Sequence, residues 1–203
     1  MKFWSTVLKA LLLLCVVLPT YGMRSETLMS EINDDTLIEN YVENFLSNKE
    51  GTVPHIDTGG NPTAAYGVFD SLGLNRDDYS SDKDFAKAVV QLHINDLRSG
   101  PRAKVFDFDA LPDSMKYVAL DLNYNAGDIL KKAPSFAKEL GKGNYQVALK
   151  QSLDVLQGYD PTTNRQGIIS GLAKRRAAMY NNAAQELDLP KINNVELSDA
   201  GSN

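Results

Sequence analysis

Residues 34–50 read DDTLIENYVENFLSNKE, and their apolar side chains recur at the spacing of one face of a helix. Gly51 supplies a common stop signal, so we predict a helix whose last residue is Glu50. The negative end of the helix dipole disfavours a carboxylate there and raises its pKa. A raised pKa suits a general acid that works near neutral pH. The segment therefore predicts both an early helix and a candidate catalytic acid.

A second carboxylate and a hydroxyl follow this helix at Asp57 and Thr63, beyond a turn rich in Gly and Pro. Two carboxyl groups that flank a glycosidic bond can hydrolyse it. We therefore expect Glu50 to protonate the glycosidic oxygen and Asp57 to stabilise positive charge at the anomeric carbon or to orient a water. Thr63 would hold that water or the sugar. The alternative is an ordinary surface helix followed by routine turn chemistry.

Four segments in the same order resemble those of phage-type muramidases, the T4-lysozyme-like group. They are residues 49–68 with the Glu, Asp and Thr just named, residues 82–94, residues 115–127, and residues 171–178 with the sequence GLAKRRAA. The chain departs from the family in two respects. Six residues separate Glu50 from Asp57 where the family usually has eight, and Val68 follows Gly67 where the family tends to have His.

The resemblance implies an α+β fold. It would be mostly helical and lysozyme-like, with a small β-hairpin lobe around residues 53–68, a larger helical lobe and an interlobe groove for an extended peptidoglycan strand. It also implies inversion of configuration. A carboxyl separation of about 6.5 to 9.5 Å would give inversion, and one of about 5 to 5.5 Å retention.

Four further residues are candidate substrate-binding groups. Asn125 lies at the end of the central helix predicted at 115–127, and Tyr66 could stack on a sugar or belong to the core. Arg175 or Arg176 could direct a guanidinium to the catalytic carboxylates, since an arginine orients a carboxyl group well. The alternative for the two arginines is a solvated helix face. Gly127 can serve as a helix cap alone.

Other chemistries find little support in the pattern. His55 and His93 are isolated, without further metal ligands at suitable spacing, so we expect no metal and no cofactor. Phosphate loops and serine-hydrolase motifs are absent from the sequence. Two alternatives to a muramidase stay open: a lytic transglycosylase, and a non-catalytic peptidoglycan-binding or virion-associated structural protein.

The N-terminus has the pattern of a targeting segment. Lys2 and Lys9 precede an apolar stretch at residues 10–18, and small residues precede Met23. Nine apolar residues cannot span about 30 Å of hydrocarbon. We expect residues 1–22 to be a cleaved signal peptide, with a signal anchor as the alternative. The chain would then be periplasmic or secreted, with transient tethering to the membrane in the anchor case.

Composition and length predict one domain. The 203 residues are 43% hydrophobic and 23% charged, enough for one sizeable core. We expect a flexible leader at 23–33, the domain at 34–189 and a disordered tail at 190–203. Cys15 lies in the targeting segment, so the mature domain would lack disulfides. The net charge of −5 gives no general attraction to nucleic acid, and we expect a monomer that binds peptidoglycan glycan strands.

Overall fold

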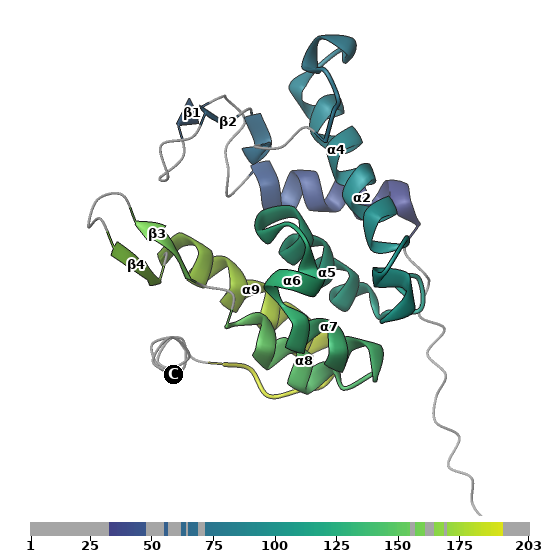
Figure 1. Ribbon diagram of the computed structural model, residues 1–203, viewed down its shortest axis with the longest axis vertical. Helices are drawn as coiled ribbons and strands as arrows, with labels where there is room; N and C mark the ends of the chain where they lie inside the picture. The colour runs from purple at the N-terminus through teal and green to yellow at the C-terminus, as the bar shows by residue number, and fades with distance from the viewer. Residues whose placement is uncertain are drawn as a thin grey trace, which may run out of the picture. The chain divides into compact units, whose positions relative to one another are not determined.

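The computed structural model describes residues 33–47, 55–56, 62–63, 65–68, 72–154, 157–160, 165–168 and 170–192 (Figure 1). These residues belong to the compact unit Ile32–Asn203, which is separate from Met1–Glu31. The predicted residues Glu50 and Asp57, the targeting segment and most of the leader and tail lie outside the described residues. Within the described part of the chain, no helix combines the length and the apolar character needed to cross a membrane.

The predicted first helix begins where the sequence indicates. Helix α2 spans Asp34–Tyr41, and the side chain of Asn33 caps it by accepting a hydrogen bond from the Thr36 amide at 2.8 Å. The chain then widens into one π-helical turn, η1, at Val42–Leu46. The buried residues lie on one face, as the spacing predicted. Insertions of this kind are frequent at functional sites.

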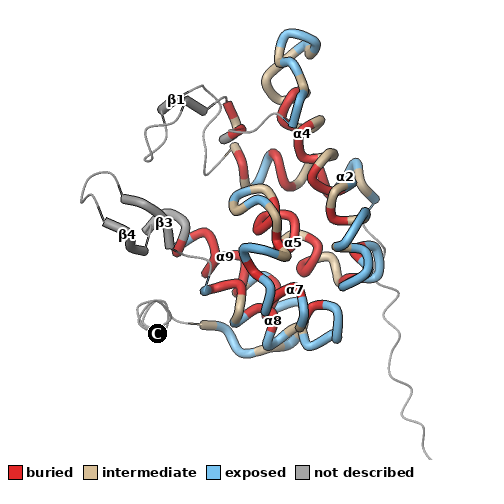
Figure 2. The backbone as a smooth tube through the Cα atoms, in the orientation of Figure 1, coloured by how far each residue is buried: buried red, intermediate tan, exposed pale blue. Residues whose placement is uncertain are grey.

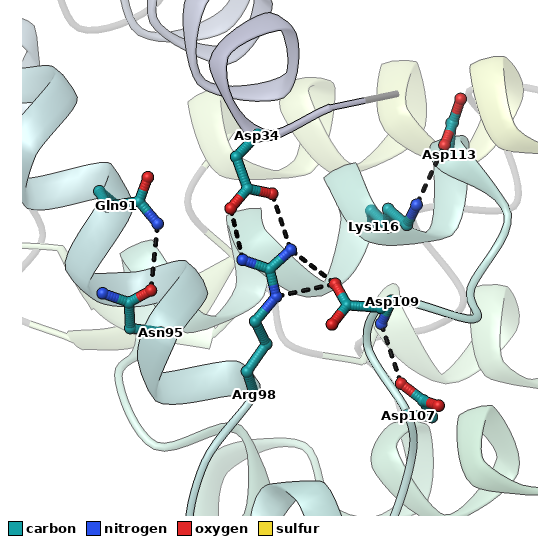
Figure 3. Close-up of polar contacts among 8 residues, drawn as sticks. All are labelled: Asp34, Gln91, Asn95, Arg98, Asp107, Asp109, Asp113 and Lys116. Carbon is teal, nitrogen blue, oxygen red and sulfur yellow. Dashed lines mark hydrogen bonds and ion pairs between the residues drawn. The ribbon is translucent and has the colours of Figure 1, made fainter. Parts of the chain in front are cut away.

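Helix α4 (Asp82–Leu97) carries the second predicted apolar face. Ser81 caps its first turn by accepting a hydrogen bond from the Asp84 amide. After the helix, Arg98 binds Asp34 with both guanidinium Nη atoms, at 2.5 and 2.7 Å, and also binds Asp109 (Figure 3). This contact fixes the start of α2 against the end of α4.

Helix α5 (Asp113–Ala126) is the central helix that the sequence predicted. Figure 2 shows it largely buried, with exposed residues concentrated on the surrounding elements. It ends at Gly127, which adopts a φ of 78° that L-residues avoid. Helices α4, α6, α8 and α9 all contact it. The remaining helices are α6 at Ile129–Lys132, α7 at Pro134–Gly141, α8 at Tyr145–Ser152 and α9 at Ser170–Glu186, with short 3₁₀ turns η2 at Ala65–Gly67, η3 at Arg76–Asp78 and η4 at Arg102–Lys104.

The expected α+β fold with a β-hairpin lobe is wrong, because helices build the described part of the chain. The strands form only two isolated antiparallel pairs. The first joins β1 (His55–Ile56) to β2 (Pro62–Thr63), and two residues a strand are too few to make a lobe. Without such a lobe, the predicted interlobe groove is not supported either. The described part of the chain is mostly helical, as the sequence also predicted.

The second strand pair also corrects two predicted helix boundaries. Strand β3 (Gln157–Asp160) pairs with β4 (Arg165–Ile168), and Gly158 lies opposite Gly167. The sequence pattern predicted helices near 145–156 and 167–187, whereas α8 ends at Ser152 and α9 begins at Ser170. Glycine is poorly suited to a helix interior, which is the physical reason for both boundaries.

Candidate functional site

The centre of the candidate site is a fully buried carboxylate, Asp121 of α5. Its Oδ1 accepts hydrogen bonds from the Tyr41 hydroxyl at 3.0 Å, the Arg175 Nε at 2.6 Å and the Asn125 Nδ2 at 3.0 Å. Its Oδ2 accepts one from Arg176 Nη1. These five residues come from α2, α5 and α9, so one carboxylate joins three helices.

The cluster is charged as well as buried. Arg175 and Arg176 are both more than nine-tenths buried, and both form ion pairs with Asp121. Burial lowers the pKa of Arg176, although a guanidinium remains protonated in proteins. Within the described part of the chain, its Nε and Nη2 have no hydrogen-bond partner. These nitrogens can therefore donate to a further acceptor nearby.

Tyr41 completes the cluster as a neutral group. Its hydroxyl donates to Asp121 and accepts from Arg175 Nη2 at 3.1 Å. Burial and the negative charge of Asp121 raise the pKa of Tyr41 well above its ordinary value. The phenol thus stays protonated, and it orients both the carboxylate and the guanidinium.

A pocket of about 670 Å³ lies at the C-terminal end of α5. Its volume is within the range of about 300 to 1,000 Å³ that small-molecule sites occupy. The lining residues come from α4, η4, the end of α5 and the loops around them: Leu72, Leu92, His93, Asp96, Arg102, Asn123, Tyr124, Asn125, Ala126, Gly127 and Asp128. Polar side chains thus meet here around a concave surface.

A chain of polar contacts holds the wall of this pocket. Asn123 Nδ2 lies 3.1 Å from Asp96 Oδ2 and 3.2 Å from His93 Nδ1. Arg102 binds Asp96 at 2.7 Å and Asp128 at 3.1 Å. Asn123 Nδ2 can donate to His93 Nδ1 in the histidine tautomer whose Nδ1 carries no proton. The wall is therefore arranged before any ligand enters, which reduces the cost of binding.

Asn125 connects the pocket to the buried cluster. It lines the pocket, and its Nδ2 also donates to the Asp121 backbone carbonyl at 2.8 Å. Tyr124, beside it, donates its hydroxyl to the Tyr66 carbonyl at 3.1 Å and packs against the His93 ring at 5.0 Å between centroids. A ligand in the pocket would thus contact side chains that Asp121 and Tyr66 hold in place.

The structure brings together four of the seven candidate residues. Tyr66 is partly buried against the core, and its φ of 61° is unusual for a residue other than glycine. Asn125 lines the pocket, while Arg175 and Arg176 bind Asp121, so the solvated-face alternative for the arginines is wrong. The structure describes only the backbone of Thr63, which lies in β2 opposite His55.

The sequence interpretation missed the residue at the centre of the cluster. Asp121 stands between Leu120 and Leu122 in the predicted central helix. A carboxylate in an apolar helix must find a cationic partner, because burying an unpaired charge is very costly. The adjacent arginines at 175 and 176 were the available partners. His93, Asp96, Arg102 and Asn123 carry no comparable signal, because they are ordinary in the surface pattern of a helix or loop.

Comparison with known proteins identifies no relative: no family model matches the chain, and no curated protein sequence matches it.

Proposed function

We propose that the chain is a peptidoglycan hydrolase that cleaves the β-1,4 bond between N-acetylmuramic acid and N-acetylglucosamine by general acid catalysis. One observation supports this proposal above the others. The segments that resemble parts of phage-type muramidases are spread over about 130 residues of sequence, yet described residues from all four meet around the Asp121 cluster and the adjoining pocket.

The contacts that support this convergence are specific. The first segment reaches the site through the Tyr66 carbonyl, which accepts the Tyr124 hydroxyl of the third segment. The second segment contributes His93 to the pocket wall. The third supplies Asp121 and Asn125, and the fourth supplies the two arginines. The contacts among the four segments support the proposal.

The proposed mechanism assigns the chemistry to Glu50, Asp57 and Thr63. Glu50 protonates the glycosidic oxygen. Asp57 stabilises the developing positive charge or orients the attacking water, and Thr63 holds that water or the sugar. Arg175 and Arg176 bind Asp121 and would help to orient the catalytic carboxylates. The amide oxygen of Asn125 can accept hydrogen bonds from sugar hydroxyl and acetamido N–H groups along the pocket, while its N–H groups bind Asp121.

We further propose export of the chain to the periplasm or the cell exterior, in phage-encoded lysis or related cell-wall degradation. In this proposal the N-terminal segment alone meets the membrane, and the domain acts as a monomer on glycan strands. The negative net charge gives no general attraction to an anionic wall, so local groups must bind the substrate.

The deciding experiment incubates the full chain with purified insoluble peptidoglycan and identifies the released fragments by mass spectrometry. A muramidase releases fragments with reducing N-acetylmuramic acid ends. Anhydro-muramic ends would show a lytic transglycosylase instead. If every peptidoglycan chemotype stays intact while the folded chain sediments with it, the proposal is wrong and the chain is a binding protein.

A further inference from the structure

A second pocket, of about 370 Å³, lies between the N-terminal helical segment, the first half of α5 and the second half of α9. It shares no lining residue with the larger pocket at the end of α5. Among the described residues that line it, none is proposed for catalysis or substrate binding. The residues that line the second pocket therefore need a separate functional explanation.

The floor of this second pocket is apolar, and one wall is aromatic. Val118, Met179 and Ala183 are buried beneath it. Phe45 and Tyr117 form the wall, with ring centroids 5.7 Å apart and an interplanar angle of 33°. Phe45 belongs to the π-helical turn η1, which directs it toward α5. A ligand would thus meet two half-buried rings over an aliphatic base.

Ser114 contributes a buried hydroxyl group to the second pocket. The residue is more than nine-tenths buried, it lines the pocket, and its Oγ has no hydrogen-bond partner among the described residues. Leaving a buried hydroxyl unpaired costs free energy, so such groups normally have a protein, water or ligand partner. An acceptor or donor entering the pocket would remove this cost.

The rest of the polar lining selects the charge of the ligand. Asn40 and Asn182 contribute amides, which both donate and accept, and Glu186 contributes a carboxylate. Among the described lining residues, Glu186 is the one acidic group, and Lys and Arg are absent. An anionic ligand would therefore be repelled, whereas a neutral ligand with several donors and acceptors would be matched.

We propose that this second pocket binds a neutral acetamido pyranose, represented by N-acetylglucosamine, at a site separate from the larger pocket at the end of α5. A pyranose has an apolar face of C–H groups that can pack on Phe45 or Tyr117, and hydroxyls that pair with Asn182 and Glu186. Its acetamido group provides a methyl for the apolar floor and polar atoms for Ser114. The inference goes beyond glycoside hydrolysis and does not depend on it.

The test is a titration of the isotope-labelled full chain with N-acetylglucosamine, followed by two-dimensional NMR. We expect saturable shifts for Tyr117, Ser114 and the Asn182 side-chain amide, with a Kd on the order of 1 mM for so small a ligand. Signals of Asn125 and Gly127 report the larger pocket separately. The readout is binding alone, so peptidoglycan cleavage can succeed or fail without altering it.

Two variants and a control sharpen the test. Ser114→Ala should weaken binding about 3- to 10-fold, the effect of one hydrogen bond, without lowering the stability of the free protein. Asn182→Leu should weaken it to a similar extent. Gln185→Leu is the control, because Gln185 is exposed on the same helix and does not line the pocket. It should change the Kd less than about twofold.

Three results would overturn the proposal. The first is the absence of saturable shifts at the second pocket. The second is a Kd that neither Ser114→Ala nor Asn182→Leu changes. The third is binding of n-butylammonium, but not of N-acetylglucosamine, at these residues, which would show a cation site organised by Glu186.

Discussion

Arg176 of α9 binds the carboxylate of Asp121 in α5, and the two side chains are 1% and 0% exposed. No solvent screens this ion pair, and each charge would be costly to bury alone. The pair therefore specifies how α9 packs on the central helix. With Arg175 on the other carboxylate oxygen, it also holds the candidate site together.

Replacing Asp121 by Asn should sharply destabilise the fold. The substitution removes the carboxylate that binds two buried guanidinium groups, which costs about 3 to 5 kcal/mol of unfolding free energy. Urea denaturation followed by circular dichroism measures this difference. Asp109→Asn is the matched control, since the Asp109 side chain is 60% exposed in its pair with Arg98 and should contribute less than about 1 kcal/mol. Equal losses for the two variants would contradict the role of Asp121.

Catalysis should depend on Glu50. Glu50→Gln is expected to lower peptidoglycan hydrolysis by at least about 100-fold, because an amide cannot donate the proton. Asp57→Asn should also be severely impaired, since an amide neither offsets positive charge nor activates water. Thr63→Ala should cost less if Thr63 only positions a water. Turbidity clearing of permeabilised cells gives the rates, and circular dichroism verifies folding.

The control for this series is Glu43→Gln, which changes an exposed glutamate of η1 outside both pockets. It should retain wild-type activity. Wild-type activity in folded Glu50→Gln would eliminate the proposed acid.

The contact between Asp34 and Arg98 predicts a dependence of stability on pH (Figure 3). The hydrogen bond from Arg98 lowers the pKa of Asp34 below its ordinary value. Its stabilisation is therefore fully present above the unfolded-state pKa of about 4, and it is lost as the pH falls through the lower folded-state pKa.

Asp34→Asn should accordingly cost stability at pH 7, by no more than about 1 kcal/mol because the pair is partly exposed. The difference from wild type should shrink as the pH falls below about 4. Thermal unfolding between pH 7 and pH 3 measures it. A gap that widens on acidification would contradict the assignment.

Gly141, the last residue of α7, should not tolerate a side chain. Helix propensity alone favours Ala over Gly by about 0.5 to 1 kcal/mol. A Cβ at position 141, however, would lie 1.9 Å from the Val105 carbonyl oxygen, so backbone must move. We expect Gly141→Ala to destabilise by about 1 to 3 kcal/mol in urea denaturation. Ser135→Ala on the exposed side of the same helix is the control and should be nearly neutral. A stabilised Gly141→Ala would refute the close approach.

Export should remove the targeting segment. The Lys-flanked apolar stretch and the small residues that follow it predict a mature chain beginning at or near Met23. Intact-mass measurement of periplasmic protein checks this start. Recovery of a membrane-bound species that keeps residues 1–22 would favour the signal anchor.

The local sequence pattern alone predicted several of the helices. The apolar spacing at 34–46 and 82–97 and the glycine at 127 predicted α2, α4 and the end of α5, because these signals act between neighbours in the chain. The same reasoning failed near residues 156 and 167. There, glycines allow β3 and β4 to pair, and pairing depends on residues that lie across a turn.

Only the tertiary structure decided the site. The sequence predicted roles for Asn125, Arg175 and Arg176. It did not identify Asp121 as the carboxylate that binds them. The two arginines lie 54 and 55 positions from Asp121, and contacts at such separations leave no periodic signal in the sequence. The same holds for Tyr41, 80 residues from Asp121. Burial converts these separate polar residues into one network, since a charge removed from water must be paired with whatever the fold brings beside it.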